Sequence, residues 1–166
     1  MELSKTESIV SIIKQQFESE ILQLEEPYQL LTISLKPDRI IEIIQFLYDH
    51  PELQFQFLTT LCGIHYPDQN QLAVMYQLHN FKQNQRIRLK IFISVDQPEV
   101  PTLTGVFSAA NWMERETYDF FGIVFTGHPN LKRILNVDDM IFFPLRKEFP
   151  LEDQTREDKN DALFGR

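Results

Sequence analysis

The chain has 166 residues, of which 43% are hydrophobic, and a formal net charge of −8. This size and composition predict one globular domain, and the negative charge argues against general binding to nucleic acid or anionic lipid, because both need a basic surface. Cys62 is the only cysteine, which excludes an internal disulfide and a zinc or iron–sulfur site held by four thiolates of this chain.

The first fifty residues alternate between helix and strand patterns. Apolar side chains recur at helical spacing over residues 6–24, which predicts an amphipathic helix that ends before Pro27. Residues 28–35 are rich in β-forming side chains and predict a short strand. A second helix is expected to begin near Pro37 and to end at His50. Its inward apolar stripe comprises Ile40, Ile43, Ile44 and Leu47.

Three strands are predicted next. Residues 55–64 are mostly apolar, which is typical of a central strand. Residues 71–79 and 86–95 alternate between apolar and polar side chains, so each should bury one face. The loop at 80–85 is short enough for a hairpin, and the two alternating strands are therefore expected to be antiparallel neighbours.

A third helix is expected after two prolines interrupt the chain. Thr102 or Thr104 can cap a helix that runs to Phe121, and Gly122 follows at the position where a helix commonly ends. The expected inward stripe comprises Val106, Ala110, Met113 and Phe120.

This order of elements predicts a two-layer α+β fold, with helices on one side of a mixed, largely antiparallel sheet and an extended C-terminal arm. Residues 1–137 are expected to form the domain. Residues 138–151 combine many apolar side chains with two prolines, which forbid a continuous helix, so we expect an extended arm that binds a partner. Residues 152–166 are almost wholly polar and predict a flexible tail.

Sequence patterns for cofactor or metal binding are missing. The five glycines are scattered and form no phosphate-binding loop. The histidines at 50, 65, 79 and 128 lack metal-binding spacing and are interpreted as surface or turn residues. We therefore predict no catalytic residue, cofactor or metal on this chain. The acids near the N-terminus and the lack of a long apolar run also predict neither a secretory signal nor a membrane span.

The densest charge lies in the third helix, where Glu114, Arg115, Glu116 and Asp119 fall within six positions. A solvated helix face would contain an Arg115–Asp119 ion pair. A catalytic acid/base pair would require Glu114 and Glu116 to share a substrate, although side chains two positions apart point to opposite sides. The sequence favours a partner-facing or half-buried charge network, because buried acids persist when cations pair with them. The available cations are Lys132, Arg133, Arg146 and Lys147.

The same region resembles a family signature. The residues that carry the resemblance are Glu114, Arg115, Glu116, Asp119, Phe120, Phe121, His128, Lys132, Ile134 and Leu135. The pattern is similar to the signature of the C-subunit family of NADH–quinone oxidoreductase, the bacterial counterpart of the thirty-kilodalton subunit of respiratory complex I. Further segments resemble the family in the same order, over residues 5–151.

The resemblance implies a peripheral-arm subunit that binds no cofactor itself. In such a complex, electrons pass from NADH through FMN and iron–sulfur clusters on other subunits to a quinone, and this transfer is coupled to proton translocation. The resemblance implies contacts with the D and B subunits of the quinone module, made by the signature residues together with Arg133, Arg146 and Lys147. It places the chain on the cytoplasmic side of the inner membrane, held there through its partners.

The chain departs from the family pattern at two places. Residues 140–143 replace an expected Trp-Glu-Gly-His, so Phe143 stands in the position of a histidine, and His65 stands where an aspartate is usual. Two other interpretations stay open. One is an equivalent subunit of a related membrane-bound hydrogenase-type complex, and the other is a freestanding acid/base enzyme that uses Glu114 or Glu116.

Overall fold

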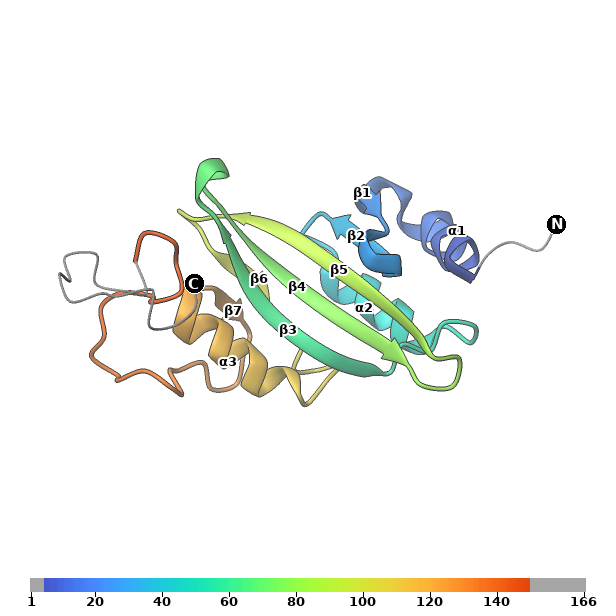
Figure 1. Cartoon of the computed structure of the whole chain (residues 1–166). Helices are drawn as coiled ribbons and strands as arrows, with labels where there is room; N and C mark the ends of the chain where they lie inside the picture. The colour runs from blue at the N-terminus through green and yellow to red at the C-terminus, as the bar shows by residue number, and fades with distance from the viewer. Residues whose placement is uncertain (1–4, 150–166) are drawn as a thin grey trace, which may run out of the picture.

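The computed structural model describes residues 5–149. These residues form two layers, with helices on one side of a five-stranded sheet (Figure 1). The helices and strands, in chain order, are α1 (Lys5–Phe17), β1 (Ile21–Glu25), β2 (Thr32–Leu35), α2 (Ile40–Asp49), β3 (Phe57–Tyr66), β4 (Gln71–Asn80), β5 (Gln85–Ser94), β6 (Glu99–Pro101), α3 (Ala110–Phe121) and β7 (Val124–Thr126). The α+β class expected from the sequence is confirmed.

The large sheet is mixed but mostly antiparallel, as predicted. Its strand order is β1-β2-β5-β4-β3, and every neighbouring pair is antiparallel except β2 with β5. The predicted hairpin between β4 and β5 is confirmed, because the two strands pair in continuous register from Asn80–Gln85 to Gln71–Ser94. This register places the fully buried apolar residues Leu72, Val74, Tyr76 and Leu78 of β4 on the same face as Ile87, Leu89 and Ile91 of β5.

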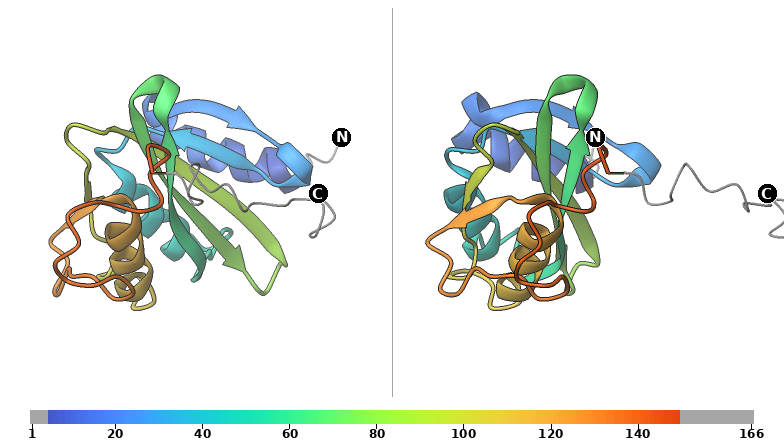
Figure 2. Two further views of the ribbon diagram at one scale, coloured as in Figure 1. Left: turned by 60° about the vertical axis from the view of Figure 1, so that its left-hand side comes forward. Right: turned by 90° about the vertical axis from the view of Figure 1, so that its left-hand side faces the viewer.

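That apolar face forms one wall of the core. Val74 pairs with Ile91 and Tyr76 pairs with Leu89, and all four side chains are fully buried. The helices cover this face, and Figure 2 shows them gathered on the same side of the strands. Each buried aliphatic side chain contributes about 1.5–3 kcal/mol to the free energy of unfolding, so this layer is a principal source of stability.

Helix α2 packs on the sheet through the apolar stripe that the sequence predicts. Ile40, Ile43, Ile44 and Leu47 are all fully buried. The helix ends as expected at His50, whose N–H donates to the carbonyl of Phe46. Helix α1 lies beside α2, where the ring of Phe17 meets that of Phe46 edge to face at 5.4 Å between centroids.

The prediction of a single helix over residues 6–24 is wrong beyond Phe17. The chain passes through a short 3-10 turn and then forms β1, which pairs with β2. Ile21 lies opposite Leu35 and Leu24 lies opposite Ile33, and both side chains pack against the core. The strand is favoured because it pairs backbone groups of β2 that would otherwise form an open sheet edge.

Two strand predictions need correction. The strand expected at 28–35 begins only at Thr32, because residues 27–29 form a 3-10 turn in which Tyr28 and Gln29 have positive φ. The strand expected at 55–64 spans Phe57–Tyr66 and lies at the sheet edge, not at its centre. Its apolar composition reflects the packing of α3 over one of its faces.

A second, two-stranded sheet was missed by the sequence analysis. β6 pairs in parallel with β7, and Val100 faces Phe125 with both side chains buried. Pro101 closes β6, a position at which a strand tolerates a residue that cannot donate a backbone hydrogen bond. This pairing holds together the segments that enter and leave α3.

Residues 138–149 form no helix or strand and pass through successive turns beside α3 (Figure 1, orange to red). The N–H of Leu145 donates to the carbonyl of Phe120, which fixes this segment to the end of α3. Residues 150–151 of the predicted arm and the predicted tail at 152–166 lie outside the described residues. Within residues 5–149, no helix has both the length and the apolar character needed to span a membrane.

Candidate functional site

The charged segment lies on α3, but this helix starts later than predicted. It begins at Ala110, and residues 102–109 form turns. Neither Thr102 nor Thr104 caps it, because Thr102 instead donates its hydroxyl to a carboxylate oxygen of Glu114, with 2.5 Å between oxygens. The buried residues of α3 are Ala110, Glu114, Arg115, Thr117 and Asp119. Of the predicted apolar stripe, only Ala110 is fully buried, so α3 turns a mainly polar face inward.

Gly122 ends α3, as the sequence predicts. Its φ of 74° is left-handed, and its N–H donates to the carbonyl of Tyr118 at 2.8 Å. A Cβ built at Gly122 would overlap the ring of Phe143. Glycine is therefore required here twice, once for the backbone conformation and once for the close approach of an aromatic ring.

Asp119 is the centre of a buried hydrogen-bond network. Its carboxylate accepts five hydrogen bonds, two of them from side chains. Arg133 Nη1 donates at 2.8 Å, and the side-chain amide of Asn136 donates at 3.0 Å. The consecutive backbone N–H groups of Ile134, Leu135 and Asn136 donate at 2.8–3.0 Å. One fully buried carboxylate thus fixes the path of the loop that follows β7.

The hydrogen bonds keep Asp119 ionised. Burial by itself would raise its pKa. The hydrogen bonds from the backbone and side chain of Asn136, from the Leu135 backbone and from Arg133 outweigh burial and hold the pKa of this carboxyl well below its usual range. Five donors occupy the acceptor positions of the carboxylate, so no lone pair is left for proton transfer with solvent. The role of Asp119 is therefore to fix the loop at residues 133–136 against α3.

Arg133 and Arg146 connect this network to the segment at 138–149. Arg133 also donates to the carbonyls of Met140 and Phe142, at 2.7 and 3.1 Å. Arg146 donates through Nε to the carbonyl of Phe121 at 2.7 Å. Both guanidinium groups lie about 5 Å from the centroid of the Phe143 ring, which they hold between them. Phe143, one of the departures from the family pattern, is thus an aromatic surface for two arginines.

Arg115 does not form the ion pair with Asp119 that a solvated helix face would contain. Its guanidinium donates to the carbonyls of Lys132 and Arg133, at 3.2 and 3.3 Å, and lies 5.0 Å from the ring of Trp112. Asp119 points to the other side, toward Arg133. The intrahelical pair is therefore absent because both partners are used to hold the same downstream loop.

Glu114 is the second buried carboxylate of α3, and it faces the segment before the helix. One oxygen accepts the hydroxyl of Thr102, and the other accepts the N–H of Leu103 at 2.7 Å. Burial raises the pKa of Glu114, and these two hydrogen bonds only partly offset it. Glu116, by contrast, is exposed. The two glutamates therefore do not face a common space in which they could act as an acid/base pair.

His128 completes the environment of Glu114 and is not the surface residue that the sequence suggested. Its side chain is fully buried, and Nδ1 accepts the N–H of Asn130 at 3.0 Å. The ring proton therefore lies on Nε2, which is 3.1 Å from the carbonyl of Asn111 and 4.0 Å from Glu114. His128 thus joins the turn after β7 to the start of α3.

His65, the other departure from the family pattern, is also buried rather than exposed. It lies on β3, and its Nδ1 accepts the N–H of Lys147 at 2.9 Å. A carboxylate oxygen of Glu148 lies 3.3 Å from the same nitrogen. The segment at 138–149 is therefore attached to the sheet as well as to α3.

The structure divides the predicted site residues into two groups. Buried or half-buried members hold the chain together, and they are Glu114, Arg115, Asp119, Phe120, Phe121, His128, Arg133 and Arg146. Glu116, Lys132 and Lys147 are exposed around them. Sequence reasoning missed Asn136 and the exposed Trp112, and it gave Thr102 the role of a helix cap. The partners of Asn136 and Thr102 are set by tertiary contacts that no local pattern marks, whereas Trp112 contacts Arg115 one turn along the same helix.

The segment that this network holds presents apolar side chains to solvent. Ile141 is 95% exposed. The other exposed large apolar residues after β7 are Leu135, Val137, Phe142, Leu145 and Phe149. This many exposed large apolar side chains on one short segment is typical of an interface.

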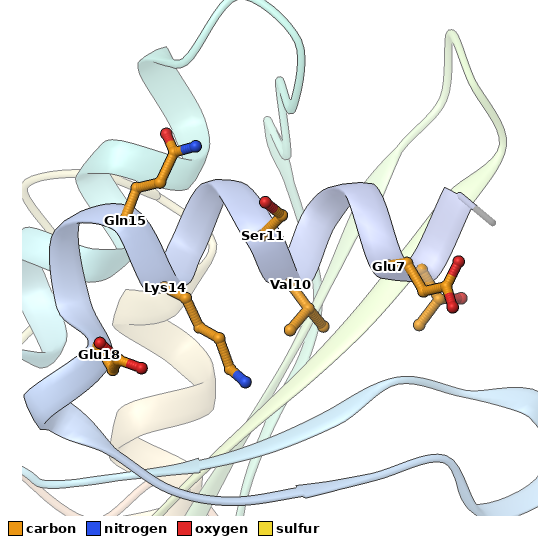
Figure 3. A pocket seen from close by; sticks show the side chains of 7 residues that line it. Glu7, Val10, Ser11, Lys14, Gln15 and Glu18 are labelled. Atoms are coloured by element: carbon orange, nitrogen blue, oxygen red, sulfur yellow. The ribbon is translucent and has the colours of Figure 1, made fainter. Parts of the chain in front are cut away.

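No other feature suggests a chemical site within residues 5–149, where no three metal-binding side chains come together. The thiol of Cys62 is half-buried, and burial raises its pKa. A shallow hollow runs along α1, where Val10, Lys14 and Glu18 are among the lining side chains (Figure 3). Its lining residues come from α1 and the turn that follows it, and they include no group of converging catalytic side chains.

Comparison with known sequences assigns the chain to a family. The family described as "Respiratory-chain NADH dehydrogenase, 30 Kd subunit" matches residues 33–155. The C subunit of the NADH-quinone oxidoreductase of Roseiflexus sp. (strain RS-1) is 47% identical over 122 residues, which are 73% of this chain and 70% of that protein. The corresponding C subunit of Mycolicibacterium gilvum is 45% identical over 123 residues, which are 73% of this chain but only 54% of that protein.

Solved structures show the same fold. A trypsin-resistant fragment of Nqo5 is similar with a TM-score of 0.63 and 27% identity, over 77% of this chain and all of the fragment. A chain of the membrane-bound sulfane sulfur reductase, an archaeal respiratory membrane complex, is similar with a TM-score of 0.74 and 22% identity, over 89% of this chain and 87% of that one. The second likeness concerns the fold alone.

Proposed function

Because this chain belongs to the family of the 30 kDa subunit of respiratory-chain NADH dehydrogenase, we propose that it is an interface subunit of NADH–quinone oxidoreductase that holds no redox group itself. Electrons would pass from NADH through FMN and iron–sulfur clusters on other subunits to a quinone, coupled to proton translocation. The contribution of this chain would be to position those subunits on the cytoplasmic side of the membrane.

The observation that best supports this role is the contrast between the backbone and side chains of residues 133–149. Their backbone is held by buried ionic and hydrogen-bonding groups, chiefly Asp119, Arg133 and Arg146. Six of their large apolar side chains are nevertheless exposed to solvent, and Ile141 is the most exposed of them. A surface that is ordered before its partner arrives loses less conformational entropy on binding, which favours a stable interface.

We propose the D and B subunits of the quinone module as the partners of this surface. The proposal follows from the family resemblance of the signature, whose residues build the network beneath the surface. The exposed Lys132 and Lys147 would lie at the rim, where charges guide association and contribute little affinity.

Co-purification of the tagged chain from gently solubilised membranes tests this proposal. The unaltered chain should recover the D and B subunits. Ile141→Asp should reduce that recovery about tenfold or more, because a charge would replace a central apolar contact. Leu22→Asp is the matched control, since Leu22 is 57% exposed on β1 and far from the arm in sequence. Recovery of the unaltered chain alone, without other subunits, would contradict the proposed role.

The related-complex interpretation makes a different prediction in the same experiment. A chain that served a hydrogenase-type complex would co-purify with that complex's subunits and not with those of NADH–quinone oxidoreductase. A freestanding acid/base enzyme would instead lose activity with Glu116→Gln while its co-purifying subunits stayed unchanged. Glu116 is the better position for this test, because replacing the buried, doubly hydrogen-bonded Glu114 also changes the stability of the fold.

A further inference from the structure

The large sheet has a second face, which no helix within residues 5–149 covers. This face points away from α1, α2 and α3, and it is toward the viewer in Figure 1 (Figures 1 and 2). Its side chains are the alternate residues of β3, β4 and β5, so Arg88 lies opposite Gln77, and Lys90 lies opposite Met75. Most of these side chains are half-buried and not fully exposed, because neighbouring side chains on adjacent strands pack against one another. We call this surface the open sheet face.

Three cations lie in a row on the open sheet face. Arg86, Arg88 and Lys90 are alternate residues of β5 and therefore point to the same side. None of them forms an ion pair with an acid among the residues that the structure describes. This is notable in a chain whose net charge is −8, where acids are plentiful.

Apolar and aromatic side chains surround this row. Met75 and Cys62 are paired across β4 and β3 beside Lys90. Lys90 itself lies over the rings of Tyr66 and Phe92 at one end of the face. At the other end, Phe81 is 65% exposed and contacts the ring of His79 in a tilted arrangement, with 4.3 Å between ring centroids. The face therefore combines positive charge with apolar surface.

Two nitrogen atoms on the open sheet face lack the partners that their burial requires. Arg88 Nε and His79 Nε2 are shielded from solvent but form no hydrogen bond with any described residue. His79 is only 7% exposed. Arg88 Nε always carries a proton, and a buried donor without an acceptor is costly and rare in folded proteins, so an acceptor supplied from outside would remove an existing penalty.

We propose that the open sheet face binds a segment of a neighbouring subunit that carries carboxylates among apolar side chains. The carboxylates would pair with Arg86 and Arg88, and the apolar side chains would cover Met75 and Phe81. A nucleic acid fits less well, because the cations are few and the rest of the chain is strongly negative. The identity of the partner as a subunit of the respiratory complex rests on the function proposed above.

Charge reversal in the full complex tests this inference. Arg86→Glu/Arg88→Glu, introduced into the tagged chain, should lower recovery of at least one other subunit about tenfold. Lys14→Glu/Lys36→Glu, which reverses two exposed cations away from this face, should leave recovery unchanged. Arg86→Ala, at an exposed position, should keep the melting temperature within about 2 °C of the unaltered chain and still weaken recovery.

Photo-crosslinking identifies what covers the face. A photoreactive phenylalanine analogue at position 81 should crosslink to a peptide of another subunit that contains aspartate or glutamate. Crosslinks only to lipid, to a second copy of this chain or to residues 150–166 of the same chain would overturn the inference, as would normal assembly of the double charge reversal. If that reversal assembles normally while Ile141→Asp does not, the inference fails and the proposed function stands. If the unaltered chain recovers no other subunit, both fail.

Discussion

Helices α2 and α3 lie on the same face of the sheet, but opposite kinds of side chain hold them there. α2 buries Ile40, Ile43, Ile44 and Leu47. α3 buries Glu114, Arg115, Thr117 and Asp119. Apolar packing is non-directional and needs only volume and shape, whereas each buried charge needs partners at defined distances and angles.

This difference indicates separate roles for the two helices. α2 stabilises the domain and contacts other buried apolar residues. The buried charges of α3 reach backward to residues 102–103 and forward to residues 132–136, so they determine the path of the chain on both sides. Burial of a helix does not by itself require charged groups that fix the chain on both sides. We infer that the buried charges of α3 hold in place the surface formed by residues 133–149.

The largest effect is expected when the centre of the charged network is removed. Asp119→Ala removes the carboxylate that accepts hydrogen bonds from Arg133 and from three backbone N–H groups. The free energy of unfolding should therefore decrease by about 3–5 kcal/mol, nearer the upper figure. Urea unfolding monitored by circular dichroism measures this change. Glu116→Ala, an exposed site on the same helix, should change the value by less than about 0.5 kcal/mol. Equal losses in both variants would show that Asp119 has no special role.

A cavity under α2 should cost less and should act differently. Ile44→Ala should lower the free energy of unfolding by about 3 kcal/mol, within the range for buried aliphatic truncations. Ile41→Ala, at a partly exposed position of the same helix, is the control. Hydrogen exchange should then distinguish the helices, because the Ile44 variant should keep protection at the amides of residues 134–136 and the Asp119 variant should lose it. Loss of that protection in both would contradict separate roles.

The sequence predicts α2 more fully than α3, because apolar burial leaves a local pattern and paired buried charges do not. The stripe of α2 repeats at helical spacing, and the period alone locates both the helix and its buried face. The acids of α3 were found as a cluster, and Arg133 was among the cations expected to pair with them, but the pattern did not specify which acid each cation meets, because Asp119 pairs with Arg133 from 14 positions away. No local period encodes such a contact. The stop at Gly122 was predictable, since it depends on one residue's backbone freedom.

The junction of α3 with residues 138–149 gives a smaller, steric test. Gly122→Ala should lower the free energy of unfolding by about 1–2 kcal/mol, because a Cβ is disfavoured at φ of 74° and would also overlap the ring of Phe143. Gly105→Ala is the matched control, because no atom lies within 4 Å of the added Cβ there. Thermal unfolding of both variants makes the comparison. A Gly122 variant as stable as the Gly105 variant would mean that Phe143 does not pack as described.

The smallest effect concerns the two buried carboxylates of α3, whose pKa values shift in opposite directions. The pKa of Asp119 lies below its ordinary value of 3.8, so the folded state binds its proton less readily than the unfolded state, and stability falls as pH drops through and below that value. The pKa of Glu114 lies above its ordinary value of 4.5, so the folded state retains its proton longer, and this group lowers stability as pH rises above 4.5.

Glu114→Gln should therefore remove a loss of stability that the unaltered chain undergoes above pH 4.5. The free energy of unfolding of the variant minus that of the unaltered chain should increase as the pH rises from 4.5 to 7. This increase should be smaller than the loss caused by Gly122→Ala. Urea unfolding at four pH values across this range measures the difference, and Glu116→Gln gives the baseline for removing one exposed carboxylate from α3. If the free energies of unfolding of Glu114→Gln and the unaltered chain differ by the same amount at every pH, Glu114 is as well solvated as a surface acid. The contrast between α2 and α3 would then rest on Asp119 alone.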